Sequence, residues 1–295
     1  MTASRGGAPA AMTAFLIWGL FPLFWSLLGD VPAFQLLAHR AAWCALAVWL
    51  LLLARGDLAW VASVTLRQFG WLALGGLLIS VNWGVYVWAV VNGHVIDTSL
   101  GYFITPLVSV VIAVGILGER LNRGQQVAVL LATTGVLFLA WQLAAPPWIA
   151  LTLALSFGVY GLIRKLAPFD SVRGLAVESG VMFFPAVIYL AWCELAGQGT
   201  FGHGHWRDDA LLVTGGPITA VPLALFAFGA QRVSMITLGL AQYIAPSVAL
   251  LLGIWVFHEP FGSARQVAFG CIWAALVIFS IDALRRYRAA GAPAR

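Results

Sequence analysis

Two related stretches decide the fold of this chain, Ser99–Glu119 (SLGYFITPLVSVVIAVGILGE) and Gly239–Glu259 (GLAQYIAPSVALLLGIWVFHE). They align without a gap at a shift of 140 residues, and in both the proline precedes the final glutamate by thirteen residues. The same shift pairs Ile104 with Ile244, Gly75-Gly76 with Gly215-Gly216, and Gln126-Val127-Ala128 with Gln266-Val267-Ala268. Apolar composition alone produces scattered matches, but hardly a shared proline, glutamate and triplet in one register. We therefore predict an internal repeat.

The chain is far more apolar than a soluble domain. Of its 295 residues, 62% are hydrophobic and 9% charged, against about 45–50% and about 25% in soluble domains. This excludes a water-soluble globule and a disordered chain, and a single lysine without a basic run excludes a nucleic-acid partner. Because about 20 apolar residues span a bilayer as a helix, we predict an all-α integral membrane protein with ten transmembrane helices. The stretches are 10–29, 32–54, 70–92, 96–117, 124–142, 147–165, 173–195, 210–231, 236–257 and 265–284.

The repeat divides the chain into residues 10–142 and 147–284, followed by a basic tail at 285–295. Five spans are an odd number, so the second repeat enters the membrane from the opposite side and the two repeats have inverted topology. Lysine and arginine are retained on the cytoplasmic face of membrane proteins. With the N-terminus inside, that face collects thirteen of them, Arg164 and Lys165 included, against two outside. Both termini are therefore expected in the cytoplasm, with the tail against anionic membrane lipid.

Several strings resemble RarD-type transporters of the EamA group in the drug/metabolite transporter superfamily. They are His39-Arg40, Asn82-Trp83, Ser99–Leu107, Leu117–Arg120 and Gln242–Pro246. The likeness covers nearly the whole chain. It implies a multi-pass permease of the bacterial inner membrane, with a central cavity between the repeats, that moves small metabolites or drugs outward.

Inverted repeats are typical of secondary transporters, which expose a central site to each side in turn. The only lysine, Lys165, is not part of a nucleotide-binding glycine loop, so nucleotide hydrolysis is excluded. We expect a transporter of a small-molecule substrate with no enzymatic activity, cofactor or bound metal. Two alternatives stay open: an integral-membrane enzyme acting on lipid-linked substrates, for which no catalytic motif is found, and a nonselective pore. Proton coupling and a homodimer are also open.

Three candidates for a titratable coupling group lie clearly inside the predicted spans, away from their ends: His39, Arg40 and Glu178. A charge inside a membrane costs several kcal/mol unless it is paired or hydrated, so such residues mark sites. One interpretation is a substrate-anion or proton site. The other is a structural Arg40–Glu178 pair, or snorkelling to the headgroups. For His39 a hydrogen-bonded structural role is favoured.

Polar residues recur at helical spacing in spans three, four and nine. One face of span four carries Ser99, Tyr102, Thr105 and Ser109. The predicted cavity lining also includes Gln242 of span nine and Asn82 and Tyr86 of span three. The alternative interpretation is contact between helices. Tyr243 has a ring that can stack on a solute. Pro106 and Pro246, paired by the repeat, are predicted to bend their helices and so to gate the cavity.

Two charged motifs outside the spans have structural interpretations. Glu119 and Glu259 are expected to cap the starts of spans five and ten. The His203-Gly204-His205 motif lies in a glycine-rich loop, so we predict no metal site there.

Overall fold

The computed structural model describes residues 6–92, 94–141, 148–258 and 262–290. Throughout these residues the regular structure is helical, with no strand. The helices are α1 (Gly7–Trp25), η1 (Ser26–Leu28), α2 (Ala33–Ala54), η2 (Ala59–Ser63), α3 (Leu66–Val91), α4 (Val95–Gly115), α5 (Arg123–Trp141), α6 (Trp148–Leu166), α7 (Ser171–Leu195), α8 (Trp206–Ala230), α9 (Met235–Ala241), α10 (Ile244–Trp255) and α11 (Ser263–Ala290).

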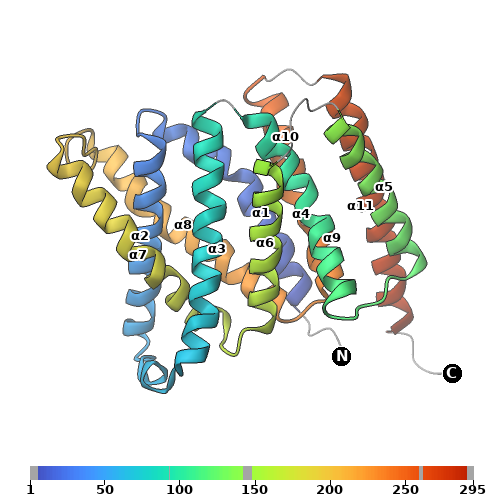
Figure 1. Cartoon of the computed structure of the whole chain (residues 1–295), viewed down its shortest axis with the longest axis horizontal. Helices are drawn as coiled ribbons and strands as arrows, with labels where there is room; N and C mark the ends of the chain where they lie inside the picture. The colour runs from blue at the N-terminus through green and yellow to red at the C-terminus, as the bar shows by residue number, and fades with distance from the viewer. Residues whose placement is uncertain (1–5, 93, 142–147, 259–261, 291–295) are drawn as a thin grey trace.

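The ten predicted apolar stretches correspond to these helices within a few residues. Nine segments of the described chain are long and apolar enough to cross a membrane, and the ninth, Met235–Trp255, contains both α9 and α10. The tenth, α11, has a shorter apolar segment at Gln266–Asp282. The chain runs up and down, so that α1 begins and α11 ends on the same side (Figure 1). We refer to this side as the lower face.

Local sequence signals explain where several helices begin. Thr65 forms a capping box, in which its hydroxyl accepts from the Gln68 backbone N–H at 3.3 Å and Gln68 Oε1 accepts from the Thr65 N–H at 3.0 Å. Asp170 caps α7 by accepting from the Val172 and Arg173 N–H groups, and Ser234 caps α9 by accepting from the Thr237 N–H. These polar caps satisfy N–H groups that the first helical turn leaves without partners.

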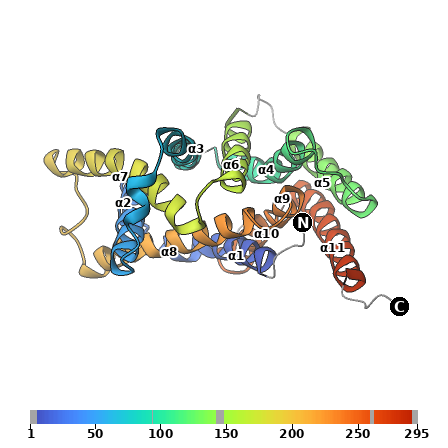
Figure 2. The same ribbon diagram turned by 90° about the horizontal axis from the view of Figure 1, so that it is seen from below.

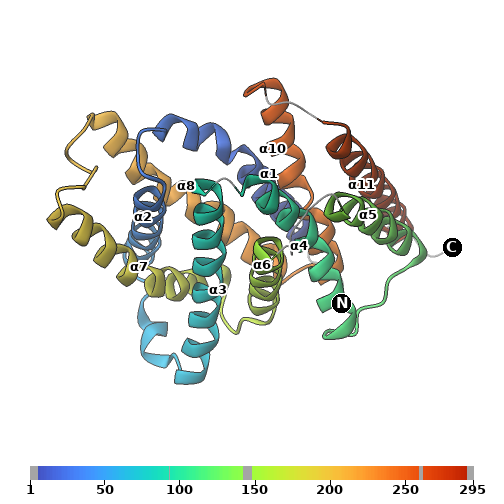
Figure 3. The same ribbon diagram turned by 45° about the horizontal axis from the view of Figure 1, so that its top comes forward.

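The two halves of the chain are interleaved. Six of the main helix contacts form three couples: α1–α8 with α3–α6, α2–α8 with α3–α7, and α1–α10 with α4–α6. In each couple, the 140-residue shift converts one contact into the other. The same shift leaves the contacts α2–α7, α4–α9 and α5–α11 unchanged. Figures 2 and 3 agree in placing α5 beside α11 at one end of the long axis and α7 at the other. Each main contact therefore joins opposite halves.

The repeated Gly-Gly pairs are located where helix backbones come closest. A Cβ on Gly76 of α3 would lie 2.8 Å from the Glu178 carbonyl oxygen of α7. A Cβ on its repeat equivalent, Gly216 of α8, would overlap the Trp43 backbone of α2. Only glycine allows this approach, so the repeated pairs are required by helix packing.

Candidate functional site

Arg40 of α2 is surrounded by aromatic rings. Its guanidinium carbon lies 3.7 Å from the Trp83 ring centroid, 5.4 Å from that of Trp25 and 5.6 Å from that of Phe21. Its Nε is buried without a hydrogen-bond partner, although the residue as a whole is only partly buried. The positive charge is therefore held against π faces, which attract a cation.

Two tyrosines adjoin this aromatic cage. Tyr86 of α3 and Tyr102 of α4 lie near Arg40, and their ring centroids are 5.7 Å apart. Tyr102 is 41% exposed and Tyr86 is half-buried. Three residues that the sequence selected from separate spans are therefore brought together.

Other members of the predicted cavity lining make contacts between or within helices. Asn82 Nδ2 donates to the Leu153 carbonyl at 2.9 Å and to Ser156 Oγ at 3.0 Å, which joins α3 to α6. Thr105 is buried and donates to the Gly101 carbonyl of its own helix at 2.7 Å. These contacts agree with the alternative interpretation of these polar residues as helix contacts.

His39 lies in an aromatic environment rather than in a polar one. Its buried ring packs 5.3 Å from the Phe201 ring, centroid to centroid. Within the described chain the His39 ring has no hydrogen bond to another residue, and a hydrogen-bonded role for it stays a prediction. Phe201 comes from the distant α7–α8 connection, which local sequence does not place.

Gln242 and Tyr243, at the junction of α9 and α10, form hydrogen bonds with α4. Gln242 Nε2 donates to Ser109 Oγ at 3.0 Å, while its buried Oε1 has no partner. The Tyr243 hydroxyl donates to the Phe103 carbonyl at 3.3 Å, and these two residues are 140 positions apart. Equivalent positions of the two halves therefore touch one another.

The two repeated prolines have different effects. Pro106 lies in the continuous helix α4, whereas Pro246 follows the break between α9 and α10. Pro246 has no N–H and so cannot donate to the Gln242 carbonyl four residues earlier. The Ala245 N–H donates to this carbonyl instead, at 3.3 Å. The predicted disruption of the helix is therefore found at Pro246, while α4 remains unbroken at Pro106.

Glu178 is paired, but not with Arg40. Its Oε1 lies 3.2 Å from Arg164 Nη1, and its Oε2 accepts from the Tyr160 hydroxyl at 3.1 Å. Arg164 is 0% and Glu178 1% exposed. The alternative of a structural Arg40–Glu178 pair is thus wrong, and Arg164, which the count of basic residues assigned to the cytoplasmic side, is buried. Arg164 lies close to the end of α6, but α7 folds over it.

Glycines leave the space for this buried pair. A Cβ at Gly174 would overlap Arg164 Nη1, and a Cβ at Gly75 would lie 2.9 Å from Glu178 Oε1. Arg164 Nη2 also donates to the Ser171 carbonyl at 2.9 Å. Sequence reasoning missed Arg164 and Tyr160 as partners of Glu178. Their spacing of four residues, which places both on one face of α6, was the available signal.

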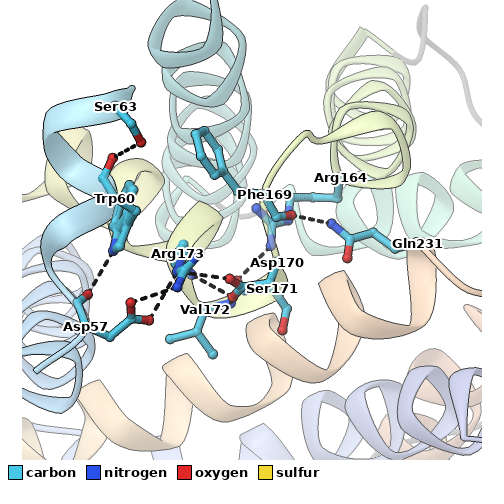
Figure 4. A network of polar contacts seen from close by, with 10 residues as sticks. All are labelled: Asp57, Trp60, Ser63, Arg164, Phe169, Asp170, Ser171, Val172, Arg173 and Gln231. Atoms are coloured by element: carbon cyan, nitrogen blue, oxygen red, sulfur yellow. Dashed lines mark hydrogen bonds and ion pairs between the residues drawn. The ribbon is translucent and has the colours of Figure 1, made fainter. Parts of the chain in front are cut away.

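Polar contacts close the lower face, as Figure 4 shows. Arg173 of α7 binds Asp57, after α2, through Nη2 at 2.7 Å and Nε at 3.1 Å. Gln231, at the end of α8, donates to the Phe169 carbonyl at 2.7 Å. These bonds tie the α2–α3 connection, the start of α7 and the end of α8 together.

Glu119 adds a further tie on the lower face. Its carboxylate accepts from the Met235 N–H at 2.7 Å and the Ile236 N–H at 3.0 Å. Glu119 therefore caps α9 of the opposite half, and the expectation that it caps span five is wrong. Its repeat equivalent Glu259 lies outside the described residues.

The half of the bundle away from the lower face contains a cavity of about 200 Å³ between α2, α3 and α7, which is partly open to the outside of the bundle. Its apolar lining includes Phe34, Leu37, Trp83, Met182 and Tyr189. A second, narrow cavity shares Trp83 and extends to Glu178, with room for about one water molecule. Trp83 thus borders both cavities and also stacks on Arg40.

Known proteins resemble this chain over nearly its full length. Residues 5–141 match the model of the EamA-like transporter family. The chain is 46% identical to protein RarD of Streptomyces exfoliatus, covering 96% of this chain and 91% of that protein. It is 41% identical to the uncharacterized transporter YojE of Bacillus subtilis strain 168 (97% of both) and 37% identical to protein RarD of Escherichia coli K12 (97% of both). A crystal structure with 21% identity covers 95% of this chain and 98% of its own, and its TM-score of 0.70 shows a shared fold.

Proposed function

Because the chain belongs to the EamA-like transporter family, as a RarD-type member of the drug/metabolite transporter superfamily, we propose that it moves small metabolites or drugs by alternating access. It is a multi-pass membrane protein and a transporter of small substrates. The proposal adds the mechanism: two interleaved repeats, residues 10–142 and 147–284, exchange their packing and expose a central site to each side in turn. The direction is outward, by analogy with the group.

The observation that carries this mechanism is the difference between the two sides: both have polar ties between the halves, with Gln35 bound to Gln198 and Thr200 on the upper side, but the cavity opens toward the upper side. Polar ties that cross between the halves, Arg173 with Asp57 and Glu119 with α9, close the lower face. The cavity between α2, α3 and α7 lies away from that face. The 140-residue shift converts one main helix contact of each couple into the other. A state that is open on the lower face and closed on the upper face can therefore use the same kinds of helix contact. To reach it, the polar ties on the lower face must break and equivalent ties on the upper face must form.

The proposed topology places the lower face in the cytoplasm of a bacterial cell, with the protein in the inner membrane. Lysine and arginine cluster in the connections that lie on this face, which follows the positive-inside rule. The state described is then closed to the cytoplasm.

Glu178 is the proposed site of ion coupling. It is the one carboxylate buried within a span of the described chain, and both of its oxygens have partners. Adding a proton would cancel its charge and leave Arg164 uncompensated, which favours a rearrangement of α6 against α7. A proton gradient could thereby drive the change of state.

Cross-linking tests alternating access directly. The double variant Asp57→Cys/Arg173→Cys, made in a chain whose native cysteines are replaced by serine, places a disulfide across the lower tie. We expect saturable solute flux in proteoliposomes to stop on oxidation and to return on reduction, with each single cysteine variant as a control. Flux that is unsaturable and insensitive to the cross-link would support the nonselective pore instead.

A further inference from the structure

Arg40 is a permanent charge without a protein counter-ion. A guanidinium stays protonated at any physiological pH. Helix α2 begins at Ala33, so Arg40 lies about 10 Å along the helix at 1.5 Å per residue. No carboxylate pairs with it anywhere in the described chain, and the one carboxylate buried within a described span, Glu178, is held by Arg164 and Tyr160.

The cage orients the guanidinium but leaves its hydrogen bonds unused. A distance of 3.7 Å from the guanidinium carbon to the Trp83 centroid is a face-on stack. Stacking occupies the flat faces of the group and leaves its five N–H donors, which point outward in the plane, available. Within the described residues none of these donors has an acceptor, and Nε is buried without one. These donors are therefore available to an acceptor from outside the protein.

The surroundings indicate what this acceptor is attached to. Tyr86 and Tyr102, whose rings pack against each other, both lie near Arg40, and Tyr102 is 41% exposed. Trp25 and Phe21 complete a largely aromatic environment. Carboxylates and phosphates both match the planar fork of arginine with two parallel hydrogen bonds, whereas a neutral group does so more weakly. A single arginine neutralises a carboxylate, but it would leave part of the charge of a phosphate uncompensated in these aromatic surroundings.

We propose that the solute carried by this transporter has a carboxylate, bound in bidentate fashion by Arg40, and an aromatic or apolar body in contact with Tyr86 and Tyr102. The inference rests on the proposed transport function and narrows its substrate class. Solute binding supplies the counter-charge that the protein lacks, so the loaded site is neutral at the one point where the empty site is charged.

The test compares an acid with its uncharged twin. The probes are N-acetylphenylalanine and N-acetylphenylalanine amide, whose binding to the purified protein in phosphatidylcholine nanodiscs is measured by calorimetry. We expect the acid to bind at least tenfold more tightly than the amide, since a charge-assisted bidentate contact is worth this factor or more. Arg40→Gln should abolish the difference, and Arg40→Lys, which keeps the charge but loses the fork, should retain only part of it.

Arg232→Gln is the matched control. Arg232 also stacks on an aromatic ring, Phe228, at 3.5 Å, but outside this site, so its replacement should leave the acid preference unchanged. Thermal melting of each variant verifies that it is folded. If Arg40→Gln does not fold, Tyr102→Phe and Arg40→Lys carry the test, and both should reduce acid binding.

Three results would overturn the inference: equal binding of acid and amide, an acid preference that survives in Arg40→Gln and Arg40→Lys, or Arg40-dependent binding of phosphatidylglycerol in place of the acid. The last result would identify a lipid headgroup as the counter-ion. Saturable flux of neutral solutes with no acid preference would refute the carboxylate and leave the transport function standing. Absence of any flux despite Arg40-dependent acid binding would refute transport instead.

Discussion

Replacing Glu178 by glutamine should destabilise the protein more than replacing any exposed charge. The ion pair with Arg164 is almost completely shielded from solvent, at 0% and 1% exposure. Glutamine keeps the size of the side chain and can still accept from Tyr160, but it leaves a buried guanidinium whose remaining backbone acceptor is the Ser171 carbonyl. Breaking a buried pair in this way costs about 3–5 kcal/mol.

At roughly 2–4 °C per kcal/mol for a chain of this size, Glu178→Gln should lower the melting temperature by roughly 6–20 °C. The assay heats the protein in detergent and measures the fraction that stays folded by fluorescence-detected size-exclusion chromatography. The double variant Arg164→Met/Glu178→Gln removes the orphaned charge as well, so it should recover at least half of the loss. A melting temperature for Glu178→Gln within 2 °C of the unmodified protein, or a double variant no better than the single one, would refute the reasoning.

The other predictions concern the second arginine, the lower ties and the glycine contacts. Arg40→Gln should melt at or above the temperature of the unmodified protein, because it removes a charge that no carboxylate compensates, while solute flux is lost; melting and flux are measured on the same preparation. Breaking the Arg173–Asp57 pair with Asp57→Asn should cost less than about 1 kcal/mol, since both side chains are more than a third exposed, but should increase labelling of cysteines introduced at the lower face. Gly76→Ala should destabilise by about 1–3 kcal/mol, because its Cβ meets the α7 backbone, whereas Gly84→Ala, with nothing within 4 Å, should be neutral or stabilising; parallel melting curves decide between them.

The positions of the helices could be predicted because hydropathy is a local property. A bilayer requires about 20 apolar residues for each crossing whatever the neighbours are, and the ten stretches agree with the helices found. The break before Pro246 was also foreseeable from its missing N–H. That α4 stays unbroken at the equivalent Pro106 was not foreseeable, because the two prolines have the same local chemistry and differ only in their surroundings.

For the candidate site, the sequence identified unusual residues but not their partners. Arg40 was selected because a charge inside a span is costly, and Tyr86 and Tyr102 because polar residues recur at helical spacing; the structure places the three near one another. Glu178 was selected because a charge inside a span is costly, and the one partner considered for it, Arg40, is not the arginine that it binds. Its true partner, Arg164, was counted as a surface charge because it is close to a helix end.

The sequence by itself determined the apolar spans, their internal repeat and the few residues whose charge needs an explanation, since each depends on composition and spacing along the chain. Only the tertiary structure decided which arginine pairs with Glu178 and which is left to aromatic rings. The reason is physical: an ion pair requires N···O distances below about 4 Å, and two side chains on different helices reach that distance only through the packing of the backbones. Glycines such as Gly174 set that packing here, by leaving the space that Arg164 fills.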